Sequence, residues 1–560
     1  MGDFLFKPIE GLPPLAIHDR STLSNKTGTW RSVRPVYATK LAPCRQGCPI
    51  GVNMPAYFNL VKQGRLAEAW ELIRQDNPLP AVCGRVCYHP CEERCNRRQF
   101  DEPVSINAIE RVVGDYGLGI TDKGPAVTAP GHRVAVVGSG PTGLSCAYHL
   151  ARLGNAATIY EATSVVGGML ALGIPEYRLP RDVLRAEIAS IEQMGVEIVT
   201  GVRVGTELPL SALFEQGFRA VFLAIGAHRA IAPQLLGLDK VGVLDAISFL
   251  RQVNANQKVS LGRRVAVIGG GNVAIDAARC ARRLGAEQVT ILYRRSRDEM
   301  PAHATEIRAA EDEGVRLQCL VAPTEVLGEG WVIGIKCQRT TLGDRDASGR
   351  RTPLPISGSE FTLEVDAVIV ATGQAPNAAS LAREELAQNV NGTIKVDEAT
   401  LATSRPGVFA GGDAVTGPAR VVDAIAAGKR AARSIHHYLT SQPISSEVDS
   451  PPEVGFGDLN LDYFEHAPRV SYGEIPVRER LRGFQEVNLA LSADEVQRET
   501  ERCFSCGLCN GCDNCWLYCP DLAVSREDSV YSVNYDYCKG CGICVVECPR
   551  SAIRVEEEAR

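Results

Sequence analysis

Residues 133–154 read RVAVVGSGPTGLSCAYHLARLG, and this stretch indicates the class of the fold. An apolar strand comes first, a glycine-rich turn follows, and a helix begins directly afterwards. Gly138 permits the turn, Gly140 lets the backbone approach a pyrophosphate, and Gly143 allows the helix and strand to pack closely. Glu161 ends the next strand, where its carboxylate can accept hydrogen bonds from ribose hydroxyls. The stretch therefore predicts a dinucleotide-binding βαβ unit.

The same pattern recurs at residues 263–285, which read RRVAVIGGGNVAIDAARCARRLG. Its turn carries G-x-G-x-x-A at Gly269, Gly271 and Ala274. The strand that follows ends in Arg294 and Arg295 instead of an acid. Arginine favours a 2′-phosphate, so we expect NADP(H) here, with NAD(H) as the alternative. The other interpretation is that both arginines belong to a solvated basic face.

A third nucleotide-related segment lies at residues 407–429 and reads GVFAGGDAVTGPARVVDAIAAGK. A strand ends near Gly412 and Asp413, and a helix begins near Arg420. In flavoproteins with two nucleotide sites, such an aspartate binds the ribityl–pyrophosphate part of FAD. The first unit and this segment together predict an FAD site, although Asp413 taken alone could be a helix cap.

Composition and charge limit the classes of function that the 560-residue chain can have. The formal net charge is -6, which does not favour a nucleic-acid partner. No run of about 18 apolar residues suggests a membrane span, and the first residues do not resemble a signal peptide, so we expect a cytoplasmic protein. Twenty cysteines are present. Four of them are scattered and are expected to be buried small hydrophobes: Cys146, Cys280, Cys319 and Cys337.

Near the C-terminus, two C-x2-C-x2-C-x3-C-P runs follow the spacing of bacterial ferredoxins. In two-cluster ferredoxins the fourth cysteine of each run binds the other cluster. The first predicted [4Fe-4S] cluster is therefore held by Cys509, Cys512, Cys515 and Cys548, and the second by Cys538, Cys541, Cys544 and Cys519. A zinc-binding scaffold is the non-enzyme alternative, but one zinc ion needs only four ligands.

The N-terminal cysteines are fewer than two cubane clusters require. They are Cys44, Cys48, Cys83, Cys87, Cys91 and Cys95, and residues 55–76 between them show apolar residues at helical spacing. Two further cysteines, Cys503 and Cys506, precede the ferredoxin runs without belonging to them.

These signals predict an α/β protein with two Rossmann-like domains, an N-terminal helical iron–sulfur domain and a C-terminal α+β ferredoxin-like domain. The expected boundaries are 1–130 for an arm and the helical domain, 131–245 and 375–442 for the FAD domain, 246–374 for the NAD(P)H domain, 443–500 for a linker, and 501–560 for the ferredoxin-like domain.

The chain resembles the glutamate synthase small (β) subunit family of flavoproteins. The matching stretches include CPIGVNMPAYFNLVKQGRLAEAWELI, LPAVCGRVC, INAIERVVGD, GGMLALGIPEYRLP, YRRSRDEMPA, ATGQAPN and the segment around Asp413. They cover roughly residues 40–440. The resemblance implies FAD, NADPH and two N-terminal [4Fe-4S] clusters, one with a non-cysteine ligand. It also places Gly168 and the stretch 173–180 near the flavin.

By the same resemblance, one N-terminal cluster uses Cys48, Cys87, Cys91 and the carboxylate of Glu110. The other uses the equivalents of Cys44 and Cys95 with an upstream C-x2-C that this chain lacks. Our hypothesis is that Cys503 and Cys506 replace this pair, which gives four clusters in total. The competing interpretations are a lost cluster, leaving three, or Cys83 as a substitute ligand.

The predicted function is an NAD(P)H-linked oxidoreductase that exchanges electrons between NADP(H) and an iron–sulfur partner through FAD and the clusters. No catalytic side chain is needed for the hydride step. We expect a hetero-oligomer with a ferredoxin or an iron–sulfur subunit, for example of a 2-oxoacid:acceptor oxidoreductase or a sulfite-reductase-linked complex. The alternatives are a glutamate synthase small subunit and a flavin-bifurcating ferredoxin:NADP oxidoreductase subunit. A disulfide reductase is disfavoured because Cys146 and Cys280 are isolated.

Overall fold

The computed structural model describes residues 26–120, 131–346, 349–376, 384–443, 451–528 and 530–558. The chain divides into two units. The large unit comprises residues 44–449 and 468–503, and the small unit comprises residues 1–43, 450–467 and 504–560. The boundary expected near residue 130 falls at the edge of a segment outside the described residues.

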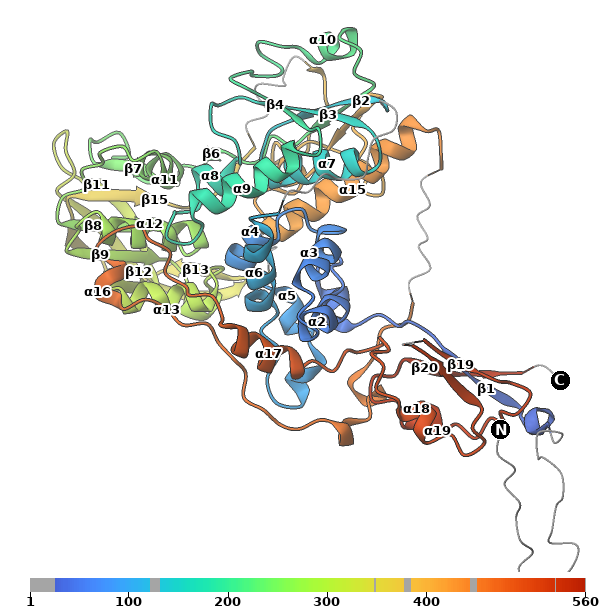
Figure 1. Ribbon diagram of the computed structural model, residues 1–560. Coiled ribbons are helices and arrows are strands. Elements are labelled where there is room, and N and C mark those ends of the chain that lie inside the picture. Colours follow the sequence, from blue (N-terminus) through green and yellow to red (C-terminus); the bar gives the residue numbers. More distant parts are fainter. Residues whose placement is uncertain are drawn as a thin grey trace, which may run out of the picture. The chain divides into compact units, whose positions relative to one another are not determined.

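The first Rossmann-like domain of the large unit is a parallel sheet in the order β17-β5-β2-β3-β4. Its strands are β2 (Arg133–Val137), β3 (Ala156–Glu161), β4 (Glu197–Thr200), β5 (Ala220–Leu223) and β17 (Val408–Ala410). Val134 and Val136 on the central strand are fully buried, as expected for a parallel sheet covered on both faces. Helices α7 (Pro141–Arg152) and α15 (Val421–Leu439) run side by side along one face (Figure 1).

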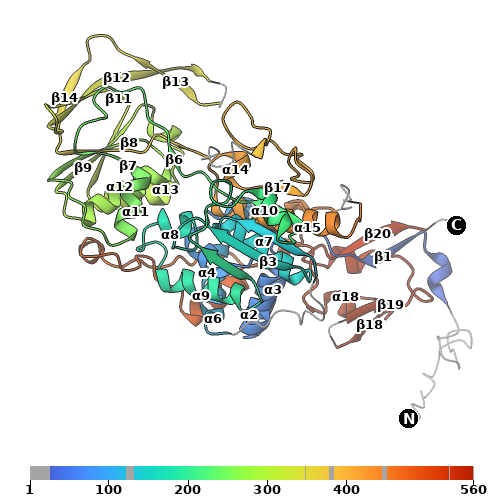
Figure 2. The same ribbon diagram turned by 90° about the horizontal axis from the view of Figure 1, so that it is seen from above.

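The second Rossmann-like domain repeats this design in the order β10-β9-β8-β15-β7. Its elements are β7 (Val243–Asp245), α11 (Ala246–Asn254), β8 (Arg264–Ile268), α12 (Asn272–Arg283), β9 (Gln288–Tyr293), α13 (Ala304–Asp312), β10 (Val315–Cys319) and β15 (Ala367–Val370). Antiparallel strands β11 (Val321–Leu327), β12 (Gly334–Arg345), β13 (Arg351–Pro355) and β14 (Phe361–Glu364) cover one face, and the helices cover the other (Figure 2).

The chain passes between the two Rossmann-like domains through a short ribbon, in which β6 (Arg229–Ala230) pairs with β16 (Gln374–Ala375) in antiparallel fashion. The first domain is therefore built from two separate stretches of sequence and the second is inserted between them. The predicted α/β class with two Rossmann-like domains is confirmed.

The N-terminal part of the large unit is helical, with α1 (Pro43–Gly47), α2 (Met54–Lys62), α3 (Leu66–Arg74), α4 (Pro80–Val86), α5 (Pro90–Glu93) and α6 (Ile106–Gly117). Helices α4 and α6 approach closely because each presents a glycine to the other. A Cβ on Gly84 would lie 2.3 Å from the Cα of Arg111, and one on Gly114 would lie 2.5 Å from the backbone nitrogen of Ala81. This approach brings Cys83 of α4 beside α6.

Residues 468–503, most of the expected linker, belong to the large unit. They contain α16 (Val477–Arg480) and α17 (Ala493–Glu501). Helix α17 begins with a capping box between Ser492 and Glu495, and it packs against α2 and α6. Helix α17 therefore belongs with the helical region, whereas Val487, earlier in the segment, joins the core of the second Rossmann-like domain.

The small unit contains a strand that the sequence does not mark clearly. Strand β1 (Val33–Tyr37), in the expected N-terminal arm, pairs antiparallel with β20 (Ile553–Glu557) at the other end of the chain. The remaining elements are α18 (Asn514–Leu517), a hairpin of β18 (Val524–Glu527) and β19 (Val530–Val533), and α19 (Ile543–Val546). The arm thus completes the ferredoxin-like fold.

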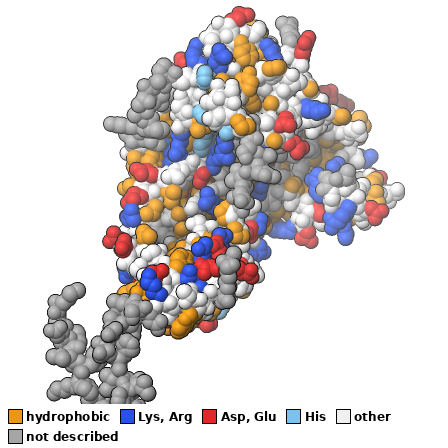
Figure 3. Space-filling view, turned by 90° about the vertical axis from the view of Figure 1, so that its right-hand side faces the viewer, with side chains coloured by type: hydrophobic (Ala, Val, Ile, Leu, Met, Phe, Trp, Pro, Cys, Tyr) orange, Lys and Arg blue, Asp and Glu red, His pale blue; other side chains and the backbone are white. Residues whose placement is uncertain are grey.

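Two surface properties bear on function. Within the described residues, none of the helices is both long enough and apolar enough to span a bilayer. On the face shown in Figure 3, basic and acidic side chains are interspersed.

Candidate functional site

A cavity of about 400 Å³ lies at the carboxyl ends of the first parallel sheet. Its lining includes the predicted FAD residues Gly138, Gly140, Glu161, Gly168 and Asp413. This is the expected location for a ligand of an open α/β sheet, and the volume suits a cofactor.

The glycines of the first turn have the roles that the motif predicts. Gly138 adopts a φ of +105°, which a residue with a side chain rarely adopts. A Cβ on Gly143 would lie 1.9 Å from the carbonyl oxygen of Gly138, so this residue must be glycine for the helix to pack. A Cβ on Gly140 would meet nothing within 4 Å. Gly140 therefore leaves open space at the N-terminus of α7, and the dinucleotide pyrophosphate fits this space.

Glu161 lies in the cavity wall and is held in place by its neighbours. One carboxylate oxygen accepts hydrogen bonds from the backbone and hydroxyl of Ser139, at 3.1 and 2.6 Å. The other accepts from the backbone and hydroxyl of Thr163, both at 2.9 Å. The carboxylate is thus oriented towards the position where a ribose would lie.

Asp413 and the segment after it form the other end of the cavity. Burial raises the pKa of Asp413 to about 6, and the carboxylate accepts a hydrogen bond from Ala419 at 3.2 Å. Helix α15 begins at Val421, so its N-terminus lies beside Asp413 as predicted. Arg420, the residue before this helix, also lines the cavity.

The sequence analysis missed two polar residues of this cavity. His228 and Arg251 both line it, and the Arg251 guanidinium contacts Nδ1 of His228 at 2.7 Å. Burial, followed by the charge of Arg251, lowers the pKa of His228. His228 follows β5 and Arg251 lies on α11, so only the tertiary fold brings them together. No cysteine is found among the described residues that line this cavity.

In the second Rossmann-like domain, the two predicted arginines differ in environment. Gly269 and Gly271 form the turn between β8 and α12, and Ala274 lies in the first turn of α12. Arg294 is exposed at the end of β9. Arg295 is buried, pairs with Asp346 at 2.7 Å and donates to the carbonyl of Arg351 at 2.6 Å. Arg294 is therefore the accessible cation of the pair.

The stretch 173–180 connects the FAD cavity to the second domain. Ile174 lines the cavity. Arg178 forms a buried ion pair with Asp276 of α12 at 2.9 Å, and it donates to the hydroxyl of Tyr88 at 3.0 Å. Tyr88 directly follows Cys87. The guanidinium of Arg178 therefore links the stretch 173–180, helix α12 and the segment that carries Cys87.

Four of the predicted N-terminal ligands lie close together. Burial is the main reason that the pKa of the Cys91 thiol is raised, and charges on Cys48 and Cys87 add to it. Burial likewise raises the pKa of Glu110 to about 7, and Glu110 accepts a hydrogen bond from Asn77 at 2.8 Å. Burial raises the pKa of Cys48 and Cys87, and the charge of Glu110 adds to this rise. Buried thiols and a buried carboxyl group suit a cluster, because bound metal favours their deprotonated forms.

Cys83 lies within the same region but is fully buried on α4. Its thiol lies 3.8 Å from Oδ1 of Asn77, the residue that also binds Glu110. The interpretation of Cys83 as a substitute ligand therefore stays open.

Cys95 and Cys503 are brought together from distant parts of the sequence. Burial raises the pKa of Cys95 to about 11, and Cys503 contributes to this rise through its charge. Arg97 donates to the carbonyl oxygen of Arg502 at 2.6 Å, which fixes the residue before Cys503 next to the segment that carries Cys95.

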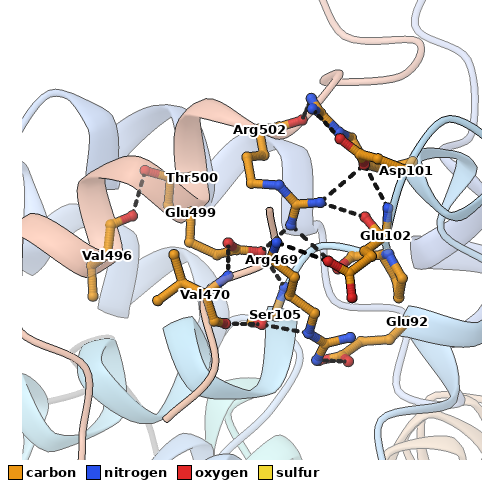
Figure 4. A network of polar contacts seen from close by, with 12 residues as sticks. Glu92, Asp101, Glu102, Ser105, Arg469, Val470, Val496, Glu499, Thr500 and Arg502 are labelled. Carbon is orange, nitrogen blue, oxygen red and sulfur yellow. Dashed lines mark hydrogen bonds and ion pairs between the residues drawn. The ribbon is translucent and has the colours of Figure 1, made fainter. Parts of the chain in front are cut away.

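A network of buried charges holds this arrangement (Figure 4). Glu499 accepts hydrogen bonds from the backbone of Ser105 and Val470, at 2.7 and 2.8 Å, and pairs with Arg502 at 2.7 Å. Arg502 also pairs with Asp101 at 3.0 Å. Both partners of the Glu499–Arg502 pair are almost fully buried, so the network positions residues 468–503 specifically on the helical region.

The helical cysteine region adjoins the FAD cavity. Arg420 lines the cavity, and its charge partly opposes the rise that burial and Glu110 cause in the pKa of Cys87. Further along α15, Lys429 donates to the carbonyl oxygen of Ile50 at 2.8 Å. These contacts place Cys87, a predicted ligand of the cluster at Glu110, beside the FAD cavity.

The small unit has two cavities that match the two predicted ferredoxin clusters. The lining of one includes Cys509, Cys512, Cys515 and Cys548, and the lining of the other includes Cys519, Cys538, Cys541 and Cys544. Backbone donors face the sulfurs: Ala552 donates to Cys548 and Ala523 to Cys519, each at 3.3 Å. Each cavity thus offers four thiols and hydrogen-bond donors, which fit a [4Fe-4S] cluster.

Within the described part of the chain, no three His, Cys, Asp or Glu side chains are arranged to hold a single metal ion. The thiols of a cubane cluster bind different iron atoms and do not need to converge on one point.

Protein-family models match three parts of the chain. Residues 132–428 match the pyridine nucleotide-disulphide oxidoreductase model. Residues 23–119 match a model described as dihydropyrimidine dehydrogenase domain II, 4Fe-4S cluster, and residues 531–554 match a 4Fe-4S binding domain.

Several known proteins are similar over most of their length. The chain is 44% identical over 501 residues to the NADP(+)-dependent formate dehydrogenase subunit beta of Moorella thermoacetica, which covers 83% of this chain and 70% of the relative. It is 39% identical over 507 residues to the NADPH-Fe(3+) oxidoreductase subunit beta of Geobacter sulfurreducens, covering 83% and 75%. It is 37% identical over 418 residues to the glutamate synthase [NADPH] small chain of Escherichia coli, covering 71% and 88%.

Proposed function

The chain belongs to the pyridine nucleotide-disulphide oxidoreductase family, within the group similar to glutamate synthase small chains, and on that premise we propose how it transfers electrons. It is an NADP(H)-linked oxidoreductase. We propose that the route runs from NADPH to FAD, then to the cluster at Glu110, and on to the ferredoxin-like clusters. The family is named for reducing disulfides, a reaction that needs a pair of cysteines beside the flavin. None of the described residues that line the flavin cavity is a cysteine.

One observation carries this proposal: Arg420 lies in the wall of the FAD cavity and within electrostatic reach of Cys87. When bound, FAD accepts a hydride as an electron pair and passes on single electrons, which cubane clusters accept one at a time. The protein positions the acceptors. Asp413, Glu161 and the N-terminus of α7 bind and orient the flavin nucleotide. Glu110 and Cys91 are buried, which limits the access of water to them.

We propose four [4Fe-4S] clusters. The ligands of the first are Cys48, Cys87, Cys91 and Glu110. The second uses Cys44, Cys95 and Cys503, which all belong to the large unit, and the proximity of Cys95 and Cys503 supports this assignment. Its fourth ligand, Cys506, remains a prediction from the sequence. The third and fourth clusters occupy the two cavities of the small unit.

For the nucleotide, we propose that Arg294 contacts the 2′-phosphate of NADPH and that Arg295 positions Arg294. Arg294 is exposed at the end of β9, whereas Arg295 is committed to Asp346. Arg294→Ala should lower kcat/KM for NADPH by roughly 10- to 100-fold, the loss of one charged hydrogen bond, and leave NADH unchanged. Arg316→Ala, an exposed arginine on β10, is the control. An equal loss with both nucleotides would exclude this role.

We propose that the chain is the NADPH-facing subunit of a larger complex whose other subunit contains iron–sulfur centres. The relatives named as beta subunits of a formate dehydrogenase and an NADPH-Fe(3+) oxidoreductase support this assembly. They also favour a dehydrogenase or metal-reducing partner over the 2-oxoacid or sulfite systems. A cytoplasmic location remains a prediction.

The decisive experiment is a count of iron, acid-labile sulfide and FAD on anaerobically purified full-length protein, followed by an NADPH titration. About 16 iron atoms per FAD would support four clusters, and about 12 would support three. Under the proposal, NADPH first bleaches the flavin and then reduces the clusters. A flavin that is bleached while all clusters stay oxidised would contradict the route.

Cys503→Ser tests the second cluster separately. If Cys503 is a ligand, the iron content should fall by about four atoms per chain. Cys319→Ser is the matched control, because Cys319 is half-buried on β10, away from the predicted ligands. An unchanged iron count in Cys503→Ser would exclude Cys503 as a ligand.

A further inference from the structure

The small unit has an internal twofold repeat with an offset of 29 residues. Cys509, Cys512, Cys515 and Cys519 correspond to Cys538, Cys541, Cys544 and Cys548. The same offset relates Ala523 to Ala552 and Val524 to Ile553, the residues that begin the strands after each run. We call the cavity lined by Cys515 the first cavity and that lined by Cys544 the second cavity.

Strand register extends this correspondence to the N-terminal arm. Ile553 pairs with Tyr37 of β1, and its counterpart Val524 pairs with Val533 of β19. Tyr37 therefore corresponds to Val533. The cavities confirm the correspondence, since Tyr37 and Ile553 line the first cavity and Val533 and Val524 line the second.

The two cavities differ in one hydrogen bond from a side chain to a sulfur. The hydroxyl of Tyr37 donates a hydrogen bond to Sγ of Cys515 at 3.1 Å. Val533, its counterpart, has no hydrogen-bond donor in its side chain. The backbone donors of the two cavities, Ala552 and Ala523, are matched in distance.

Charged side chains do not produce a comparable difference. The first cavity is lined by Arg550 and Asp513, one charge of each sign. The second is lined by Asp521, which pairs with Lys539 at 3.2 Å. The second tyrosine of the first cavity, Tyr531, donates to Asp513 at 2.6 Å and not to a sulfur. The hydroxyl of Tyr37 is therefore the main asymmetry between the two sites.

We propose that Tyr37, supplied by the N-terminal arm, raises the reduction potential of the cluster in the first cavity above that of the cluster in the second. A one-electron reduction adds one negative charge to a cluster and its thiolates, and a donor to a ligand sulfur stabilises that charge. No proton is transferred, because a phenol keeps its proton at neutral pH. The transferred electron thus resides mainly in the first cavity.

This inference rests on the proposed function, because it requires clusters in both cavities. The test is a redox titration of the anaerobic full-length chain followed by electron paramagnetic resonance, with iron counted in every sample. In Tyr37→Phe, one reduction step should move to a more negative potential while the others stay unchanged. A tenfold fall in the ratio of reduced to oxidised cluster at fixed potential corresponds to about 59 mV.

Tyr535→Phe is the matched control. Tyr535 donates to the carbonyl oxygen of Pro35 at 2.8 Å, so this change removes a hydrogen bond between the arm and the rest of the small unit without affecting a sulfur. Its potentials should equal those of the wild type. A shift of the same size in Tyr535→Phe would overturn the proposal, because the effect would then follow from loosening of the arm.

A second substitution reverses the expected sign. Incorporation of 3-fluorotyrosine at position 37 supplies a stronger donor and should move the same step to a more positive potential. Unchanged potentials in both Tyr37 variants, at full iron content, would overturn the inference. A wild-type chain that lacks the iron of the two ferredoxin-like clusters would instead contradict the proposed function, so the two failures can be distinguished.

Discussion

Exposed cysteines are found among the predicted ligands of the small unit, namely Cys509, Cys512 and Cys541, whereas the predicted cysteine ligands of the large unit are buried or half-buried. The ligands of the small unit also come from one short stretch, residues 509–548, at regular spacing. Those of the large unit come from residues 44–110 and from Cys503. The difference separates a site that is encoded locally from one that is assembled by the tertiary fold.

The two regions share one kind of interaction at their cysteines, and the large unit adds another. Backbone N–H groups donate directly to sulfurs in both units, as Ala523 does to Cys519 and His89 does to Cys87. In the large unit, buried ion pairs hold the segments that carry the cysteines, as Glu499 and Arg502 do. Removal of one partner of a buried ion pair strongly destabilises the fold, because the other charge is left buried without a counter-charge. The large-unit site should therefore be the more sensitive to single substitutions.

The largest effect is expected for Arg502→Ala. The change leaves the buried carboxylate of Glu499 without its cation, whereas Asp101 keeps its pair with Arg97, so the free energy of unfolding of the large unit should fall by about 3–5 kcal/mol. Urea unfolding followed by flavin fluorescence measures this change under anaerobic conditions. The iron content should fall as well, because Cys503 directly follows Arg502.

Arg498→Ala is the control for this prediction. Arg498 lies on the same helix but is exposed, so its removal should change stability by less than about 0.5 kcal/mol. If both variants unfold at the same urea concentration, the buried network does not stabilise the large unit, and the contrast with the small unit would not hold.

Cys48→Ser should have the next largest effect. The substitution removes a ligand of the cluster nearest the flavin, so about four iron atoms per chain should be lost. NADPH should still bleach the flavin, but the clusters of the small unit should stay oxidised while the flavin is being reduced. Stopped-flow absorbance separates the two events.

Cys319→Ser should leave both events unchanged, because Cys319 lies on β10, away from the predicted ligands. Rapid reduction of the small-unit clusters in Cys48→Ser would mean that electrons bypass the helical region. In that case the cluster at Glu110 would be structural.

The sequence was sufficient wherever function depends on short-range spacing. The turn around Gly140 and the ferredoxin runs are predicted from spacing alone, because a fixed local geometry requires these residues at these intervals. The structure places them as expected, with four thiols around each cavity of the small unit. Glu110 required the family resemblance, since a lone carboxylate on a helix has no distinctive spacing.

Features that depend on distant parts of the chain could not be predicted. Strand β1 contains Pro35 and is only five residues long, so its period-2 pattern is weak, and its partner lies at the other end of the sequence. The different environments of Arg294 and Arg295 depend on Asp346, which belongs to a later strand. Residues 468–503 are polar in composition, and only their contacts with buried groups such as Ser105 reveal that they are not a linker.

The smallest expected effect is a difference in the rate of iron loss. Oxygen and chelators reach a cluster directly when its ligands are exposed, whereas access to a buried cluster requires local opening of the protein. Brief exposure to air with an iron chelator should therefore release about eight iron atoms per chain in a first phase, from the small unit, before the rest. Chelator absorbance measures both phases. Arg502→Ala should accelerate only the second phase, since it weakens the buried network and not the small unit. If the wild type released its iron in a single phase, exposure of the cysteines would not govern the stability of the clusters.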